Sequence, residues 1–385
     1  MKQFDSQLVA LSIFHAVNDG SLAVFLAVLP VMRVSLSLSL VEIGTILSSG
    51  ILATVVMQLI FGYLADIGSS RPLLTGGLIS VAVVDLAFVR GDSYSQVLIL
   101  YVLLRAAAGV YHPVSFSTVF RTSTNKSAAL GFQSAFGDAS LAFGMFSMGF
   151  VAESYGWQTP FLIWGLVGLS GFFAFFSLMR SPLIERPVQS PRIASDADRR
   201  NGITRGYIIL QFSTAFMQCV FIVFSSFVPL FLNVNLQLSP GVSSLVVALW
   251  LALGVTSSFN AGRWVSVFGS ERRAARVCFG FTTLLLAAGA VMMFRQELWT
   301  IALMFLVLSG VTFFPIFPIM YGVVGVAAPK NRLGLAYATN LSFSLIAGSL
   351  VSYGVGYLAS AYTLVVVLPI LVLLAVAASL VVMAL

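Results

Sequence analysis

Long apolar runs, interrupted by short polar or charged breaks, dominate the chain. Most runs are about 20 residues long, the length of helix that crosses the ~30 Å hydrocarbon layer of a bilayer. They lack the polar and apolar alternation of a transmembrane β-barrel. The pattern predicts an all-α integral membrane protein with twelve transmembrane helices, over residues 8–31, 43–64, 73–90, 96–120, 127–151, 159–180, 206–232, 242–264, 274–294, 298–322, 333–357 and 361–384.

One break is longer and more polar than the others. Residues 181–205 contain three prolines, five arginines and three acidic residues, a composition typical of a linker. The sequence therefore predicts an N-terminal six-helix bundle (1–180), a linker (181–205) and a C-terminal six-helix bundle (206–385).

The composition supports membrane insertion. Hydrophobic residues make up 59% of the chain and charged residues 9%, whereas a soluble domain carries about 25% charged residues. The net charge of +7 does not indicate a nucleic-acid partner, because the basic residues lie at predicted helix ends, near lipid headgroups. We expect the lipid bilayer, and no nucleic acid, as a partner, and a monomer.

The basic residues also predict the orientation. With the N-terminus in the cytoplasm, 16 of the 20 Lys and Arg residues lie on the cytoplasmic side, and only Arg33, Arg90 and Arg295 lie outside. Cytoplasmic loops carry an excess of basic residues. We therefore expect a protein of the cytoplasmic (plasma) membrane with both termini and the linker in the cytoplasm.

The first predicted helix contains the polar stretch "IFHAVNDG" inside an otherwise apolar run. His15, Asn18 and Asp19 have i, i+3, i+4 spacing, which places them on one face of a helix. A charge at the bilayer centre costs roughly 2.5–3.5 kcal/mol even on the most lenient scale, so an ionisable residue there is a functional candidate.

The fourth predicted helix carries a second stripe. Arg105, Gly109 and His112 are at i, i+4 and i+7, and His112 lies at a depth similar to that of His15. Histidine, with an ordinary pKa of about 6.5, suits proton exchange if water reaches it. The alternative is structural: His112 could bond the carbonyl that Pro113 leaves free, and His15 could bond a backbone carbonyl.

Two further acids lie inside predicted helices. Asp138 is near mid-depth in the fifth helix, and Arg105 is its expected partner because buried charges need partners. Asp85, on a third helix expected to be peripheral, is interpreted as a structural or ion-pair residue.

The two halves show an internal repeat with an offset near 200 residues. The matching pairs are Pro30 with Pro229, Gly62 with Gly262, "GVYHP" with "GVTFFP", and Leu130-Gly131 with Leu333-Gly334. Two parallel six-helix repeats around a central substrate site form one architecture of secondary transporters.

Three motifs resemble those of the major facilitator superfamily. "FGYLADIGSSRP" resembles its loop 2–3 motif through Gly62, Asp66, Gly68 and Arg71. "LLRAAAGV" is similar to its helix 4 motif, Arg-x-x-x-Gly, which is associated with proton-coupled transport. Together, "FHAVNDG" and "YHP" resemble the fosmidomycin-resistance branch of drug exporters.

This resemblance implies the superfamily fold, with a substrate cavity between the halves that both stripes line. Proton-coupling candidates are Asp19, Asp138, His15 and His112. Candidates for binding a small-molecule substrate are Arg105, Asn18, Gln133, Gln218, Tyr321 and Asn340. Gating candidates are Gly62, Asp66, Arg71, Gly109, Pro315 and Pro318, of which the two prolines should kink the tenth helix.

The hypothesis is a proton-coupled secondary transporter that exports a small organic solute or drug by alternating access. Arg105 would be either the counter-ion of an acid or the anchor of an anionic substrate. The alternative is a proton symporter that takes up a small anion or metabolite, because the fifth helix lacks the Gly-Pro pair common in antiporters of the superfamily.

Other classes fit less well. The sequence shows no zinc-ligand pair, nucleophile elbow or phosphate loop, and the linker is too short for a catalytic domain, so we expect no enzyme and no cofactor. A channel is disfavoured by the repeat and by the lack of a filter-like segment. Cys219 and Cys278 lie in apolar segments and predict neither a disulfide nor a thiolate metal site; we expect no metal site.

Overall fold

The computed structural model describes residues 6–122, 126–179, 205–327 and 333–384. The predicted linker lies outside the described residues except for Arg205. The helices are α1 (Ser6–Ser35), α2 (Leu40–Ile67), α3 (Ser70–Ala87), α4 (Tyr94–Ala108), α5 (Tyr111–Thr122), α6 (Lys126–Tyr155), α7 (Thr159–Leu178), α9 (Arg205–Asn235), α10 (Pro240–Phe259), α11 (Ala261–Phe268), α12 (Glu271–Met292), α13 (Trp299–Phe313), α14 (Ile316–Ala327), α15 (Leu333–Tyr362) and α16 (Val367–Met383). Short 3-10 helices occupy Phe88–Arg90, Gln296–Leu298 and Leu364–Val366.

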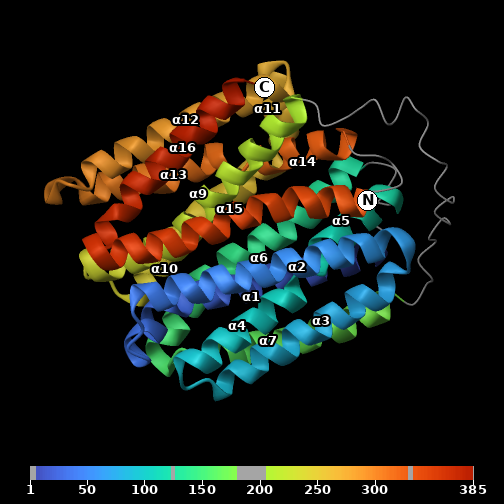
Figure 1. The fold of residues 1–385 in the computed structure, drawn as a ribbon, viewed down its shortest axis with the longest axis horizontal. Coiled ribbons are helices and arrows are strands. Elements are labelled where there is room, and N and C mark those ends of the chain that lie inside the picture. The colour runs from blue at the N-terminus through green and yellow to red at the C-terminus, as the bar shows by residue number, and fades with distance from the viewer. Residues whose placement is uncertain (1–5, 123–125, 180–204, 328–332, 385) are drawn as a thin grey trace.

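The helices form two bundles. The described residues contain twelve spans long and apolar enough to cross a membrane, which confirms the predicted count. Helices α1–α7 form one bundle and α9–α16 the other, the lower and upper parts of Figure 1. Twelve crossings return the chain to the side on which it started. We call the side where α1 begins and α16 ends the terminal face, and the other side the opposite face.

The fourth and tenth spans are each broken within the matching motifs "GVYHP" and "GVTFFP". The fourth consists of α4 and α5, separated at Gly109 and Val110, and the tenth consists of α13 and α14, separated at Phe314 and Pro315. Proline has no N–H to donate and its ring clashes with the preceding turn. The prediction of a kinked tenth helix is confirmed.

The predicted eighth helix ends earlier than expected. The sequence pattern extended it to residue 264, but α10 ends at Phe259 and a separate short helix, α11, follows. The side chain of Asn260 donates a hydrogen bond to the carbonyl of Thr256 (2.8 Å), which satisfies one of the carbonyls left free at the helix end. The prediction was wrong because it extended the helix past the polar residues Ser257, Ser258 and Asn260, at which the chain turns.

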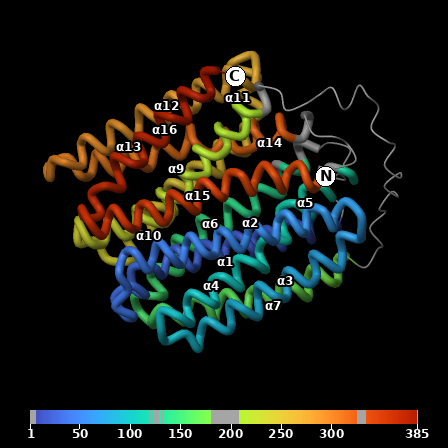
Figure 2. The backbone as a smooth tube through the Cα atoms, in the orientation of Figure 1, coloured from blue at the N-terminus to red at the C-terminus, as the bar shows by residue number. Residues whose placement is uncertain are grey.

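The two bundles meet mainly through two helix pairs, α2 with α15 and α6 with α10, and the tube in Figure 2 shows each pair side by side. Glycines permit the close approach. A Cβ at Gly356 would lie 2.6 Å from the carbonyl oxygen of Leu40 and 3.0 Å from the Cα of Gly44, near the opposite face. On the other pair, a Cβ at Gly149 would lie 2.7 Å from Ser244 Oγ.

Candidate functional site

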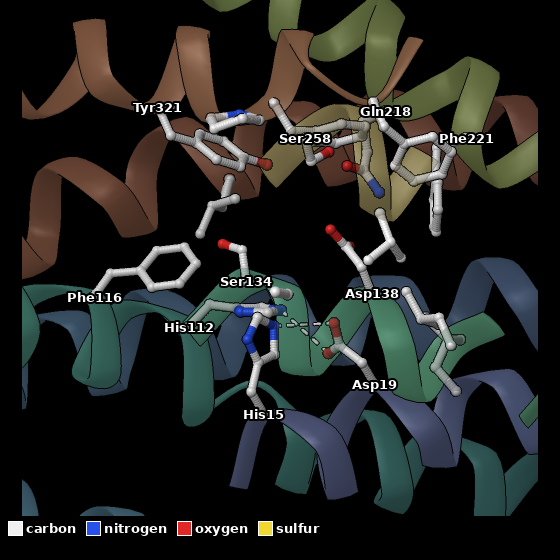
Figure 3. Close-up of a pocket in the computed structure, with 18 of the residues that line it drawn as sticks. His15, Asp19, His112, Phe116, Ser134, Asp138, Gln218, Phe221, Ser258 and Tyr321 are labelled. Carbon is white, nitrogen blue, oxygen red and sulfur yellow. Dashed lines mark ion pairs between the residues drawn. The ribbon is translucent and has the colours of Figure 1, made fainter. Parts of the chain in front are cut away.

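A cavity of about 160 Å³ lies between the two bundles. Helices α1, α2, α4, α5 and α6 line one side of it, and helices α9, α10, α14 and α15, with Phe314 between α13 and α14, line the other. Figure 3 shows the side chains from both bundles pointing into this space. The cavity is therefore the place where a solute would contact both halves.

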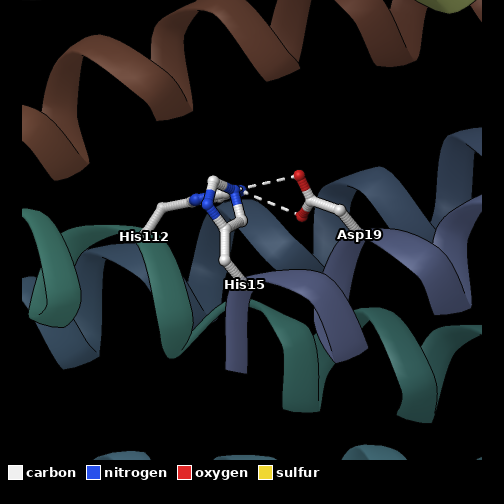
Figure 4. A group of neighbouring side chains, drawn as sticks. All are labelled: His15, Asp19 and His112. Atoms are coloured by element: carbon white, nitrogen blue, oxygen red, sulfur yellow. Dashed lines mark ion pairs between the residues drawn. The ribbon is translucent and has the colours of Figure 1, made fainter. Parts of the chain in front are cut away.

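On the N-terminal side, a carboxylate lies between two imidazoles. His15 Nε2 is 3.0 Å from Asp19 Oδ2, and His112 Nε2 is 3.7 Å from Asp19 Oδ1. Figure 4 shows both rings directed at the carboxylate. The side chain of Asn18 donates a further hydrogen bond to Asp19 Oδ1 (2.9 Å). We call His15, Asp19 and His112 the His-Asp-His cluster.

The His15 ring is held on its other side. Its Nδ1 lies 2.8 Å from the backbone carbonyl oxygen of Gln133. Since a carbonyl only accepts, Nδ1 carries a proton, and Nε2 donates to the Asp19 carboxylate when the ring is protonated. The ring packs against α6 at Gly137, where a Cβ would lie 2.5 Å from Nε2. Helix α6 thus fixes both the position and the tautomer of His15.

His112 is held less firmly. It occupies the first turn of α5, directly after the break in the fourth span, and 26% of its side chain is exposed. Its Nδ1 has no hydrogen-bond partner among the described residues. The ring can therefore rotate more freely than that of His15. The structural interpretation from sequence, a bond to the carbonyl that Pro113 frees, is not observed.

Arg105 contributes a positive charge without a counter-ion. The residue is 9% exposed and lines the cavity, and in the described part of the chain its guanidinium makes neither an ion pair nor a hydrogen bond. Its stem passes Gly50 of α2, where a Cβ would lie 2.9 Å from Arg105 Cγ. The side chain of Gln58, also in the cavity, has an unpartnered Oε1.

The expected pairing of Asp138 with Arg105 is wrong. Asp138 lines the cavity, but none of the ion pairs between described residues includes it. Its carboxyl points into the cavity near Gln218 in Figure 3. The reason is placement: Arg105 packs towards α2, whereas Asp138 follows Gly137 on α6, next to His15. The cavity thus holds one cation and one acid that have no protein partner among the described residues.

The C-terminal bundle supplies neutral and aromatic groups. Its lining residues in the described ranges carry no formal charge and include Gln218, Phe221, Ser258, Phe314, Phe317 and Tyr321. The four phenylalanine and tyrosine rings of α13 and α14 that surround the break pack edge-on or tilted against one another. This wall is suited to an apolar body with one or two hydrogen-bonding groups.

Three residues predicted to bind substrate lie outside the cavity lining. Asn18 is buried against Asp19. The Gln133 amide donates to the hydroxyls of Tyr111 (2.5 Å) and Ser115. The Asn340 amide donates to Gln211 Oε1 (2.9 Å) and Thr214 Oγ1 (3.2 Å). Gln133 and Asn340 thus join helices within one bundle, whereas Asn18 supports Asp19 on the same helix.

Asp85 has a structural environment, as interpreted from its position. It is fully buried, and the Ser21 hydroxyl lies 2.7 and 2.9 Å from its two carboxylate oxygens. The contact joins α3 to α1, and Asp85 does not line the cavity.

At the terminal face, Asp66 links the two bundles. It forms an ion pair with Arg121 of the same bundle and accepts hydrogen bonds from the backbone N–H groups of Gly334 (3.2 Å) and Leu335 (3.0 Å) at the start of α15. A Cβ at Gly62 would lie 2.5 Å from the Cβ of Ala338. We call these contacts the terminal clasp.

Arg71, the predicted gating cation, does not take part in the terminal clasp. Its guanidinium lies 5.8 Å from the centre of the Phe176 ring of α7, and Arg121 pairs with Asp66 instead. The sequence likeness put Arg71 close to Asp66 along the chain, but the first turn of α3 directs it to the other side of the bundle.

The remaining gating candidates lie at the helix breaks. Gly109 packs on α2, where a Cβ would lie 2.9 Å from Met57 Cβ and 3.0 Å from the carbonyl oxygen of Thr54. Pro315 is buried between α13 and α14, and Pro318 lines the cavity. The breaks therefore border the cavity on both sides.

Sequence reasoning missed several lining residues. Gln58, Phe116, Ser134 and Ser258 all contact the cavity. A polar residue within an apolar run was the available signal for Gln58, Ser134 and Ser258. Phe116 gave no such signal, since phenylalanine is common throughout the chain.

A family model described as Major Facilitator Superfamily matches residues 11–352. No curated protein matches the sequence. Among solved structures, a bacterial homologue of the human lysosomal transporter Spinster, in an inward-facing and occupied conformation, is 16% identical, with a TM-score of 0.78 over 98% of this chain and 95% of that chain.

Two other similar structures are transporters of different solutes. A D-xylose-proton symporter is 14% identical, with a TM-score of 0.77 over 97% of this chain and 96% of that chain. The nucleoside transporter NupG is 14% identical, with a TM-score of 0.70 over 98% of each chain. At these identities the structures establish the fold alone, whereas the family match covers most of the sequence. The chain is a secondary transporter that belongs to the Major Facilitator Superfamily.

Proposed function

We propose that this protein is a proton-coupled transporter of the plasma membrane that exports a small organic solute or drug, with its terminal face in the cytoplasm. The basic residues at the predicted cytoplasmic helix ends support this orientation. The motifs "FHAVNDG" and "YHP", which resemble the fosmidomycin-resistance exporters, support export. We further propose domain limits of 1–180 and 206–385, with 181–205 as a cytoplasmic linker.

One observation carries the proposal: proton-binding groups and an unpartnered guanidinium share one cavity between the two bundles. Asp19, with His15 and His112, can take up a proton inside the membrane. Arg105 can bind an anionic group of the solute through two parallel hydrogen bonds. The solute is therefore proposed to be a small molecule with an anionic group and an apolar or aromatic body.

Asp138 determines whether the solute and the proton move in opposite directions or together. It lines the cavity without an ion-pair partner in the described ranges. If a cationic or hydrogen-bond-donating group of the solute occupies Asp138, solute and proton exclude one another there. Such exclusion, combined with rocking of the two bundles, exchanges solute for proton, which is export driven by the inward proton gradient.

The second candidate function is symport of a small anion or metabolite. It is favoured if the solute contacts Arg105 alone, because an anion in the cavity repels the ionised Asp19 and Asp138 and so promotes their protonation. Anion and proton would then bind together. The missing Gly-Pro pair in α6 also favours this alternative.

The experiment begins with a growth-inhibition screen of cells with and without the protein across antibiotics and phosphonates, to find a solute. Everted vesicles with an acidic interior are then loaded with a pH-sensitive dye. In the antiport case, adding the solute to the outside dissipates the gradient. In the symport case, adding it to vesicles without a gradient alkalinises the medium. Full proton-driven transport by both Asp19→Asn and Asp138→Asn would refute proton coupling through these acids.

A further inference from the structure

The His-Asp-His cluster has the composition of a transition-metal site. Two imidazole nitrogens and one carboxylate form a ligand set that zinc-type ions prefer, whereas Mg²⁺ and Ca²⁺ prefer oxygen ligands alone. The ligand atoms of His15, Asp19 and His112 all lie within 4.8 Å of one another. We propose that this cluster binds a divalent transition-metal ion of the zinc type. The prediction of no metal site is not supported by this geometry, because the three ligands come together across α1 and α5 and not in a local sequence motif.

The spacing on α1 favours chelation. His15 and Asp19 are at i and i+4, so both side chains leave the same face of the helix. Their facing atoms are 3.0 Å apart. Two ligands of a tetrahedral Zn²⁺ are about 3.4 Å apart, given Zn–N and Zn–O distances of about 2.0–2.2 Å. One helix thus presents a pair of ligands that requires almost no adjustment.

The orientation of His15 matches that of a metal ligand. Its Nδ1 donates to the Gln133 carbonyl oxygen at 2.8 Å, which leaves Nε2 free for the ion. A metal-binding histidine almost always donates its other N–H to a carbonyl or carboxylate, and this partner fixes the ring and raises its basicity. The partner here is a backbone atom on another helix, held by the contact of the ring with Gly137.

His112 would close the site from α5. Its Nε2 is 3.7 Å from Asp19 Oδ1, and the widest ligand separation of 4.8 Å exceeds the tetrahedral spacing by about 1.4 Å. Rotation of the ring closes this difference, since Nδ1 has no partner among the described residues. Arg105 opposes a cation in the cavity, whereas the unpaired carboxyl of Asp138 favours it.

The site would remain open on one side. All three cluster residues line the cavity, so the fourth position of the ion would face the cavity and accept water or a solute group. The ion would also occupy the nitrogen and oxygen atoms that the proposed function assigns to protons. The binding of metal can nevertheless be measured without any transported solute, so it can fail or succeed independently of the proposed function.

The test is calorimetric titration of the purified full-length protein with Zn²⁺, using an affinity tag without histidines. A single saturable Zn²⁺ site is expected, with no heat from Mg²⁺ under the same conditions. His15→Asn, Asp19→Asn and His112→Asn should each weaken Zn²⁺ binding by roughly tenfold or more. Asp85→Asn removes a membrane-embedded carboxyl outside the cavity and should leave the affinity unchanged.

A second pair of variants tests the geometry without removing a ligand. Gly137→Ala places a methyl group 2.5 Å from His15 Nε2 and should weaken Zn²⁺ binding by roughly 10- to 100-fold. Gly144→Ala is the matched control: it also crowds α1 from α6, at 2.7 Å from Ala23 Cβ, but away from the cluster. Size-exclusion chromatography of each variant establishes that it is folded.

Three results would overturn the proposal. The first is an absence of saturable Zn²⁺ binding to the folded wild-type protein. The second is a wild-type affinity in any of the three ligand variants. The third is an equal loss in the ligand variants and in Asp85→Asn or Gly144→Ala, which would indicate a general structural effect.

Discussion

The two bundles have the same helical plan but different chemistry at the cavity. The N-terminal bundle contributes Asp19, Asp138, Arg105 and two histidines, whereas the described lining residues of the C-terminal bundle are neutral. Both bundles break one span within the matching motif, at its start before α5 and at its end before α14. A shared backbone plan thus carries titratable groups in one half and an aromatic, hydrogen-bonding surface in the other.

The two bundles also differ in their contacts at the terminal face. Gly62 and Asp66 of the N-terminal bundle contact the start of α15. Gly262, the matching residue of the repeat, has open space where a Cβ would be. The titratable cavity groups and the acid of the terminal clasp thus lie in the first half. Under the proposed function, protons bind in the first half and the second half contacts the body of the solute.

The largest expected effect is that of Asp19→Asn. We expect complete loss of proton-driven flux, because asparagine cannot take up a proton or form an ion pair with either imidazole. Dye-detected proton movement in vesicles measures it, and Asp85→Asn, outside the cavity, should retain the flux. Normal proton-driven transport by Asp19→Asn would remove the main difference between the bundles.

The second largest effect on transport should be that of Arg105→Gln. A hydrogen bond to a charged group contributes about 1.5–3 kcal/mol, so KM for an anionic solute should rise roughly 10- to 100-fold. Arg105→Lys keeps the charge but not the paired donors and should recover part of the affinity. An analogue without the anionic group should show no change, and an equal loss for this analogue would contradict the assignment.

Asp66→Asn should weaken the terminal clasp and favour states open at the terminal face. The substitution loses part of the charge-assisted bonds of Asp66, which contribute about 1.5–3 kcal/mol. The fraction of molecules open at the terminal face should therefore rise roughly tenfold. A cysteine in the cavity measures this change. Ser134→Cys, in a protein with Cys219 and Cys278 replaced by alanine, should react faster with a water-soluble maleimide when Asp66→Asn is also present. Asp92→Asn, in an exposed loop near the opposite face, is the control. Equal labelling rates in both variants would show that the clasp does not limit access.

The smallest effects should come from the C-terminal wall. Tyr321→Phe and Gln218→Ala each remove a neutral hydrogen-bonding group worth about 0.5–1.5 kcal/mol. KM should rise roughly 2- to 12-fold, while the number of protons moved per solute stays the same. A change in that number would show that the second bundle also takes part in coupling.

The fold was largely predictable because each span is a continuous apolar run. The count of twelve and the break at "GVTFFPIFP" follow from run length and from proline chemistry, which are local properties. The end of α10 was missed, because Asn260 stops the helix through its own side-chain bond to Thr256, whereas the predicted helix continued to residue 264.

The candidate site was predictable only in part. Helical spacing placed His15 with Asp19 and Arg105 with His112, and the structure brings the two imidazoles together, with ring centres 5.3 Å apart. Partners across helices depend on rotation and tilt, which spacing does not determine. That is why Asp66 pairs with Arg121, and why Asp138 and Arg105 do not pair.

The glycine contacts between α2 and α15 have a mechanical consequence. Gly44 meets Gly356 near one face, and Gly62 meets Gly334 near the other, so the same two helices touch backbone to backbone at both ends. Glycine contacts have no side chains that interlock, so the two helices can tilt against each other at these points while the bundles rock. When the bundles separate at one face, the glycine contact at the other face can remain in place as the pivot.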